Sequence, residues 1–142
     1  MWGVVHAGRR IDAPIGRDPV NRKRMSARAR RSREAVTRIV RAEPVGPAVT
    51  LAHVAIHTGR THQIRVHLSA IGHPVVGDPL YGGVRRRVRA DVRGVAHLER
   101  PFLHAARLRF THPADGRPME FTSELPEDLQ RVLQELTERA GK

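Results

Sequence analysis

The stretch from residue 49 to residue 71 constrains the fold most, because its pattern changes abruptly from that of a strand to that of a helix. Residues 49–57 alternate with the two-residue period of a strand. Gly59 interrupts this strand, since glycine lets the backbone turn sharply, and Thr61 can cap a helix that runs to about Ile71. The apolar positions of that helix fall at i, i+4 and i+7 and predict one buried stripe: Ile64, Leu68 and Ile71. We therefore predict a strand–turn–helix junction at the centre of the chain.

The segments on either side of this junction predict further strands in antiparallel pairs. Residues 35–42 alternate weakly, and the turn at residues 44–47 joins them to the central strand, which predicts a hairpin. A second pair is predicted from residues 103–110 and 119–121, which are separated by a turn. A short apolar run at residues 2–6 predicts one more strand.

Two polar segments and a final helix complete the predicted organisation. Residues 18–33 and 84–100 are rich in arginine and show no clear period, so we expect solvated segments at the surface. Pro126 can start a last helix, whose apolar face contains Leu129, Val132, Leu133 and Leu136. The predicted class is a mixed α+β fold: an antiparallel-rich sheet with a central helix and a C-terminal helix.

The composition limits the kind of protein that this chain can be. Its 142 residues make one modest domain or a piece of a larger one. Apolar residues account for 39% and only five residues are aromatic, so the core must be aliphatic and thin. The absence of cysteine excludes disulfides and thiolate zinc sites. No apolar stretch is long enough to span a membrane, and no secretory signal is evident, so we expect a cytoplasmic protein without a membrane partner.

The charge is concentrated in two places. The chain has 26 basic and 14 acidic residues, a formal net charge of +12. Residues 17–41 contain ten basic side chains against two acidic ones, and residues 85–100 contain six against two. Because 24 of the 26 basic residues are arginine, the excess could reflect a general preference for arginine at the surface. That preference does not explain two separate blocks, and we therefore predict that they bind the phosphates of a nucleic acid.

The start of the central helix is a second place where an anion is favoured. The first turn of a helix leaves backbone N–H groups without partners, and Arg60 lies immediately before it. Arg65 lies at the border of the buried face, next to Ile64. An arginine at such a border either stacks on the surface or pairs with a carboxylate in a partly buried site.

The same residues carry a resemblance to a known family. Residues 58–68, Thr-Gly-Arg-Thr-His-Gln-Ile-Arg-Val-His-Leu, resemble motif III of the RluA-like RNA pseudouridine synthases. Residues 11–19 resemble a segment found upstream of that motif, and residues 75–82 resemble its usual sequel. The resemblance extends from about Trp2 to Gly83, and a looser one continues through residues 101–121.

The resemblance implies an isomerisation of uridine in ribosomal or transfer RNA that needs no cofactor. The target base is flipped out of its stack, its glycosidic bond breaks, and the uracil is reattached through carbon. The nucleophile of the family is an aspartate in a His-Arg-Leu-Asp motif. The motif III arginine, here Arg65, pairs with that aspartate through two parallel hydrogen bonds. Ile64 resembles the apolar neighbour that packs near the target base.

The resemblance and the charge pattern together predict an RNA-binding set. We expect Arg60 and His62 to lie near RNA phosphate at the start of the helix. The basic block of residues 17–41 would bind the RNA backbone through Arg17, Arg22, Lys23, Arg24, Arg28, Arg30 and Arg31.

The sequence departs from the family at the nucleophile. None of its aspartates stands in a His-Arg-Leu-Asp context, and the family's active-site tyrosine would fall at Met1. We therefore expect residues 1–142 to form the C-terminal part of a synthase catalytic domain and to be inactive alone. Besides RNA, an upstream half that carries the nucleophile motif is then a candidate partner. Asp78 lies in the loop after the central helix, and turn geometry is sufficient to explain an aspartate at that position. Arg65 is then expected to lack a carboxylate within the chain, which would make the chain poorly stable.

Two alternatives use the same residues differently. The nine histidines suggest a metal site, but His62 and His67 are five residues apart on a helix and point in different directions, so we expect no metal. A non-catalytic RNA-binding module would keep the basic surface without the chemistry, and it is the alternative function for this chain.

Overall fold

The longest strands form a hairpin where the sequence alternates. In the computed structural model, which describes residues 1–141, β5 (Val36–Val45) pairs antiparallel with β6 (Val49–Ile56). β1 (Arg10–Asp12) pairs with the other edge of β5, which gives a three-stranded sheet in the order β1-β5-β6. Buried Thr37 and Ile39 alternate with exposed Arg38, because successive side chains of a strand point to opposite faces. The predicted hairpin is confirmed.

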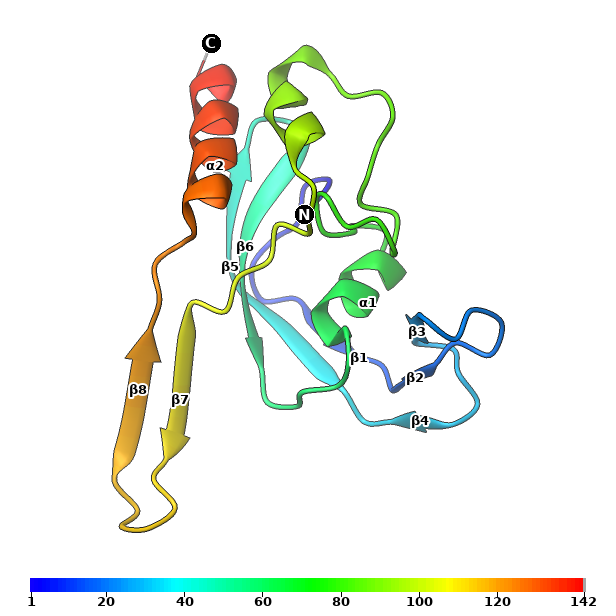
Figure 1. Ribbon diagram of the computed structural model, residues 1–142, viewed down its shortest axis with the longest axis vertical. Coiled ribbons are helices and arrows are strands. Elements are labelled where there is room, and N and C mark those ends of the chain that lie inside the picture. The colour runs from blue at the N-terminus through cyan, green and yellow to red at the C-terminus, as the bar shows by residue number, and fades with distance from the viewer. Residues whose placement is uncertain (142) are drawn as a thin grey trace.

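The central helix lies on one face of this sheet (Figure 1). α1 (Gln63–Ala70) begins one residue after His62, whose backbone is left-handed with φ of 55°. The prediction that Thr61 caps the helix is therefore wrong, and no side chain caps it by a hydrogen bond at His62. The predicted stripe does face inward: Leu68 is buried among Ile11 and Ile39, and Ile64 and Ile71 pack against the same cluster.

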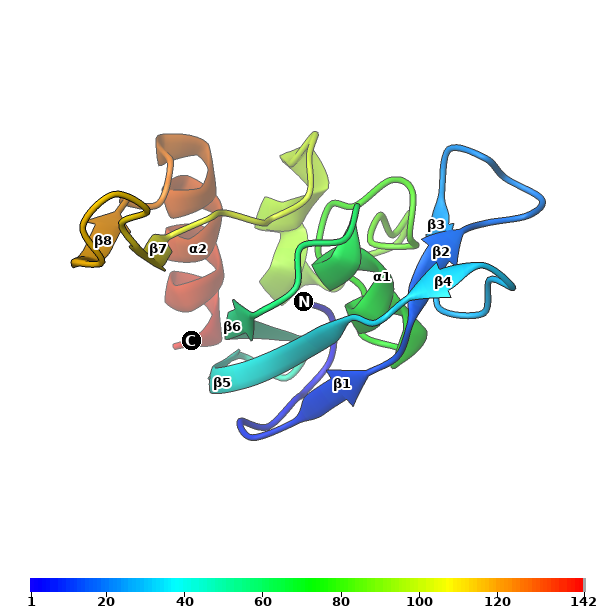
Figure 2. The same ribbon diagram turned by 90° about the horizontal axis from the view of Figure 1, so that it is seen from below.

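A second, smaller sheet lies beside α1, on the opposite side from the C-terminal elements (Figure 2). It has the order β3-β2-β4, formed by β2 (Ile15–Arg17), β3 (Met25–Ser26) and β4 (Ser32–Arg33). The prediction of an unstructured solvated loop over residues 18–33 is therefore wrong in part. Position 16 on β2 requires glycine, because a Cβ there would collide with the backbone oxygen of Arg31.

The C-terminal elements pack around the only tryptophan. α2 (Glu127–Ala140) follows Pro126 as predicted and buries Leu129, Val132 and Leu136. It packs against a 3-10 segment, η1 (Ala90–His97), within the basic stretch that the sequence predicted to be solvated at the surface; that prediction is wrong in part, because Val92 and Val95 are buried. Trp2 is buried between these elements and forms only an isolated bridge with Val49, so the strand predicted over residues 2–6 is wrong.

A two-stranded hairpin projects away from the rest of the molecule (Figure 1). β7 (Arg107–Thr111) pairs antiparallel with β8 (Pro118–Thr122). Phe110 and Phe121 stack on one another and remain exposed, together with Leu108. Helices and antiparallel strands are thus combined as predicted, with a core divided into three small, largely aliphatic clusters. Among the described residues, no helix is both long and apolar enough to cross a bilayer.

Candidate functional site

An arginine-lined groove lies between the small sheet and the turn that precedes α1. Its volume is about 740 Å³, and it is bordered by β2, β4 and the Gly59–Thr61 turn. Among the described residues, five of those that line it are arginines: Arg17, Arg30, Arg31, Arg33 and Arg60. No carboxylate side chain is among its lining residues. The groove is therefore a concave surface of positive charge, suited to an anionic ligand.

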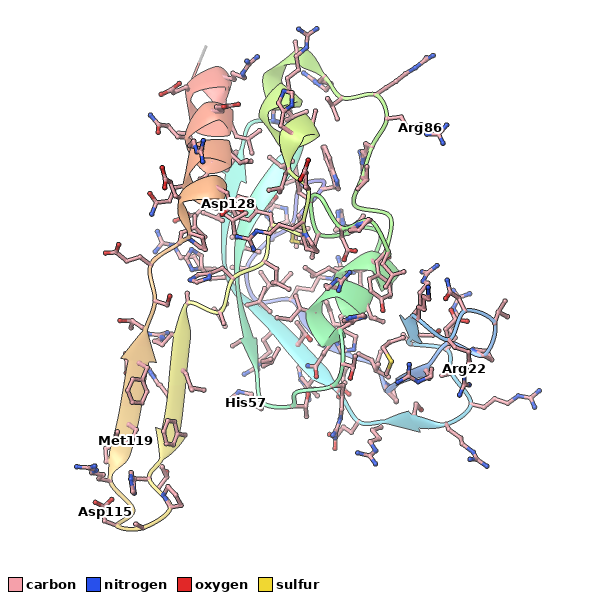
Figure 3. All side chains as sticks on the ribbon, viewed as in Figure 1. Arg22, His57, Arg86, Asp115, Met119 and Asp128 are labelled. Atoms are coloured by element: carbon pink, nitrogen blue, oxygen red, sulfur yellow. The ribbon has the colours of Figure 1, made fainter. Side chains whose placement is uncertain are left out.

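The predicted basic residues are divided between this groove and its surroundings. Arg17, Arg30, Arg31 and Arg60 line the groove, whereas Arg22, Lys23 and Arg28 are exposed outside its lining. Figure 3 places Arg22 on the loop between β2 and β3. Arg33, which the sequence did not single out, adds a fifth groove arginine because β4 turns this stretch toward the α1 turn. The role of each in RNA binding stays a prediction.

The turn before α1 is held by the side chain of Gln63. Its Oε1 accepts hydrogen bonds from the Thr58 hydroxyl at 2.8 Å and from the Arg60 backbone N–H at 3.1 Å. The Arg60 Nε in turn donates to the backbone oxygen of Glu34 at 2.8 Å. These bonds fix the position of Arg60 at the rim of the groove.

A directed chain of buried hydrogen bonds ties α1 to the sheet. Gln63 Nε2 donates to Thr37 Oγ1 at 3.1 Å, and Thr37 Oγ1 donates to His67 Nδ1 at 2.7 Å. His67 Nε2 then donates to the backbone oxygen of Ala13 at 2.7 Å. His67 and Thr37 are fully buried, so each donor in this chain must meet an acceptor. These hydrogen bonds give a structural role to two polar residues of the motif, Gln63 and His67.

Arg65 forms a buried ion pair within the chain. Its Nε donates to Asp78 Oδ2 at 2.7 Å and its Nη2 to Asp78 Oδ1 at 2.8 Å. The Asp78 side chain is fully buried, and that of Arg65 is 18% exposed. The expectation that Arg65 lacks a carboxylate partner within the chain is therefore wrong, and it no longer supports the predicted low stability of the chain, which stays a prediction. Of the two sequence-based alternatives for Arg65, pairing in a partly buried site is the one observed.

The loop after α1 presents Asp78 to this arginine. Its Oδ1 also accepts the backbone N–H groups of Leu80 at 3.0 Å and Tyr81 at 3.3 Å, which is the turn geometry expected from the sequence. Gly77 before it has φ of +80°, a conformation that favours glycine. Turn geometry is thus only part of the reason for Asp78, because the same carboxylate also holds Arg65.

The surroundings keep both partners of the pair ionised. Burial raises the pKa of the Asp78 carboxyl, but the hydrogen bonds from Arg65, Leu80 and Tyr81 outweigh it and hold that pKa below its usual value. The hydrogen bond with Asp78 raises the pKa of Arg65. Burial, followed by the charge of Arg65, lowers the pKa of His62.

His62 and Ile64 both precede Arg65 in the motif, but they have different neighbours. The His62 Nδ1 hydrogen bonds to the Tyr81 hydroxyl at 2.8 Å, and the side chain is partly buried. Ile64 is partly buried and packs toward the sheet. Contact of either residue with RNA stays a prediction. Among the described residues, no three histidine, aspartate or glutamate side chains lie together as a metal site.

Comparisons with known proteins match this region to one family. No family model matches the chain. A Chloroflexus aurantiacus protein named an uncharacterized RNA pseudouridine synthase is 49% identical over 92% of this chain and 38% of its own length. The ribosomal large subunit pseudouridine synthase D of Zymomonas mobilis is 40% identical over 89% of this chain and 39% of its own length.

A solved structure agrees with these relatives. The human RNA pseudouridylate synthase domain containing 1 matches with a TM-score of 0.65 and 28% identity, over 94% of this chain and 61% of that one. The chain thus spans about two fifths of the length of these two curated relatives.

Proposed function

The chain belongs to the RNA pseudouridine synthase family, and from this premise we propose that it forms the arginine-bearing, RNA-gripping part of an enzyme that isomerises uridine to pseudouridine. The observation that carries the proposal is the position of Arg65, one helical turn beyond the arginine-lined groove. RNA held by its phosphates in the groove would place a flipped uridine near this guanidinium. The groove arginines supply the charge that a polyanion requires.

Arg65 can bind the carboxylate of a nucleophilic aspartate while it remains bound to Asp78. A guanidinium has five N–H donors, and Asp78 takes one on Nε and one on Nη2. The Nη1 side is left for a second carboxylate, which we propose to be the aspartate of a His-Arg-Leu-Asp segment. None of the 142 residues provides that motif, so the proposal assigns the nucleophile to an upstream half that acts as a partner. Asp78 then serves as the fixed support that aims Arg65.

The proposed reaction divides the work among few groups. The aspartate carboxylate attacks the uridine and the C1′–N1 glycosidic bond breaks. The base then turns, and its C5 forms a bond to C1′ and displaces the carboxylate; the C5 proton is released to water and N1 takes up a proton. Arg65 keeps the attacking carboxylate ionised and oriented. Ile64 offers an apolar contact to the flipped base, and Arg60 and His62 lie at the phosphate side. We propose ribosomal or transfer RNA as the substrate, and the cytoplasm as the place of the reaction.

One observation favours a second candidate function. Because Arg65 already has a carboxylate partner, the groove and α1 form a complete basic surface without the upstream half. The chain alone could therefore act as a non-catalytic RNA-binding module.

Tritium release from RNA labelled at the C5 position of uridine separates the two candidates. We expect no release by the chain alone, and release when a fragment of a family member carrying the His-Arg-Leu-Asp motif is added. Arg65→Ala should abolish that release, whereas Arg131→Ala, at an exposed position on α2, should not change it. Release by the chain alone would refute the assignment of the nucleophile. No release from a demonstrated complex would favour the binding module.

A further inference from the structure

Tyr81 lies where the small sheet, α1 and the Arg65–Asp78 ion pair meet. Its side chain is 4% exposed and packs in a small cluster with Ile15 of β2 and Val66 of α1. Its backbone oxygen accepts a hydrogen bond from the Ser69 hydroxyl at 2.9 Å, so α1 also holds its main chain. The residue is therefore fixed at both ends, which is what a rigid connection between elements requires.

The hydroxyl of Tyr81 joins the small sheet to the start of α1. It accepts the backbone N–H of Met25, the first residue of β3, at 2.8 Å. It also hydrogen bonds to Nδ1 of His62 at 2.8 Å, and the two rings meet edge to face. Since the Met25 N–H occupies the hydroxyl oxygen as an acceptor, the O–H is available to donate to a neutral His62. β3 has only two residues, and so short a strand depends on contacts of this kind for its position.

The ring of Tyr81 lies close to two guanidinium groups that belong to different parts of the site. The guanidinium carbon of Arg24 lies 5.2 Å from the ring centre, and that of Arg65 lies 5.1 Å from it. Both distances are within the range of a cation–π contact. The Arg24 Nε is buried and has no hydrogen-bond partner within the part of the chain that the structure describes, so the aromatic ring is an important part of its environment. One side chain thus touches the basic block through Arg24 and the ion pair through Arg65.

We propose that Tyr81 is a positioning residue that couples the arginine-lined groove to Arg65. RNA held by β2, β3 and β4 is placed relative to Arg65 through the Tyr81 hydroxyl and ring, because these connect the small sheet, His62 and the ion pair. This inference rests on the proposed function, which makes the groove an RNA site and Arg65 the arginine of the reaction. Tyr81 itself is buried and touches no RNA in this account.

The single tyrosine of the chain makes the coupling directly observable. Fluorotyrosine incorporated into the full 142-residue chain gives one fluorine NMR signal, at Tyr81. We expect this signal to shift when a short stem-loop RNA saturates the chain, although the ring is buried away from the RNA. A signal that does not move at saturation would overturn the inference.

Tyr81→Phe provides a second measurement, because it keeps the ring and removes only the hydroxyl. We expect the affinity for the same RNA to fall about fivefold, the equivalent of one hydrogen bond of roughly 1 kcal/mol. The salt dependence of binding should stay unchanged, since no phosphate contact is lost. Thr50→Val is the matched control: it removes a buried hydroxyl that donates to the Gly3 backbone oxygen and accepts the Val5 N–H, and Thr50 lies outside the groove lining. Its RNA affinity should equal that of the wild type.

The outcomes distinguish this inference from the proposed function. Equal losses of affinity in Tyr81→Phe and Thr50→Val would show a merely structural role and would overturn the inference, as would an unchanged affinity in Tyr81→Phe. A wild-type chain that does not bind the stem-loop RNA would overturn the proposed RNA site itself.

Discussion

Replacing Asp78 by asparagine should destabilise the chain by about 3 kcal/mol. Asparagine has nearly the same shape as aspartate and keeps an oxygen for the backbone N–H groups of Leu80 and Tyr81. It replaces the second carboxylate oxygen with an amide NH2 group that faces the Arg65 Nε–H. The charge of Arg65 is then left without its counter-ion next to a fully buried side chain.

The magnitude follows from the burial of the pair. Removing one partner of a buried ion pair costs about 3–5 kcal/mol. The lower end applies because the Arg65 side chain is 18% exposed and can recover some hydration. A loss of that size is a large share of a domain's usual stability of about 5–15 kcal/mol. Urea unfolding followed by the fluorescence of Trp2 would measure it.

An exposed pair in the same chain provides the matched control. Arg100 binds Asp128 through the same two nitrogens at 2.7 and 2.9 Å, but both side chains are more than 40% exposed. Asp128→Asn therefore changes the same chemistry in water and should cost far less. Equal losses in the two variants would refute the reasoning, because burial would then have no effect on the pair.

The pH dependence gives an independent check on the same carboxylate. The pKa of Asp78 is lower in the folded chain than its usual value. Its stabilising effect is therefore fully present above that usual value, about pH 4, and is lost as the pH falls from there through the lower folded-state pKa. The difference in unfolding free energy between wild type and Asp78→Asn should therefore shrink in acid. A difference that stays constant down to pH values below about 3 would contradict the assignment.

Two further predictions concern other parts of the chain. Binding of a stem-loop RNA should weaken steeply with salt, with a log–log slope of roughly −3 to −5 for about five phosphate contacts; Arg30→Ala combined with Arg31→Ala should flatten it, and an unchanged slope would mean that the groove does not bind RNA. Thr37→Val should cost about 2–3 kcal/mol in urea unfolding, because it leaves His67 Nδ1 and a Gln63 N–H buried without partners; a neutral result would contradict the directed hydrogen-bond chain.

The sequence was sufficient for features that depend on neighbouring residues. The β5–β6 hairpin and α2 were predictable because their periods are local and strong, and the family resemblance depends on one nearly continuous motif. The concentration of arginine in residues 17–33 was also evident. The two-residue strands β3 and β4 were not predictable, because so short a pairing leaves no period in the sequence.

The missed parts of the site depend on contacts between distant residues. Asp78 meets Arg65 through the fold of the loop after α1, in which Gly77 has a positive φ, and turn geometry alone had been sufficient to explain an aspartate there. Tyr81 meets Met25 across 56 residues, and no spacing rule connects them. One signal was available for the ion pair: the sequence left open that Arg65 pairs with a carboxylate, and Asp78 lies in the loop that follows its helix.

Crosslinking of thiouridine-containing RNA to the chain tests most directly whether the groove and Arg65 form one RNA site. A stem-loop RNA would carry a single thiouridine in its loop, and the crosslinked peptides would be identified by mass spectrometry. The account predicts crosslinks within residues 15–33 and 59–65, which decrease when Arg30 and Arg31 are replaced by alanine. Crosslinks confined to the β7–β8 hairpin or α2, unaffected by those substitutions, would contradict it.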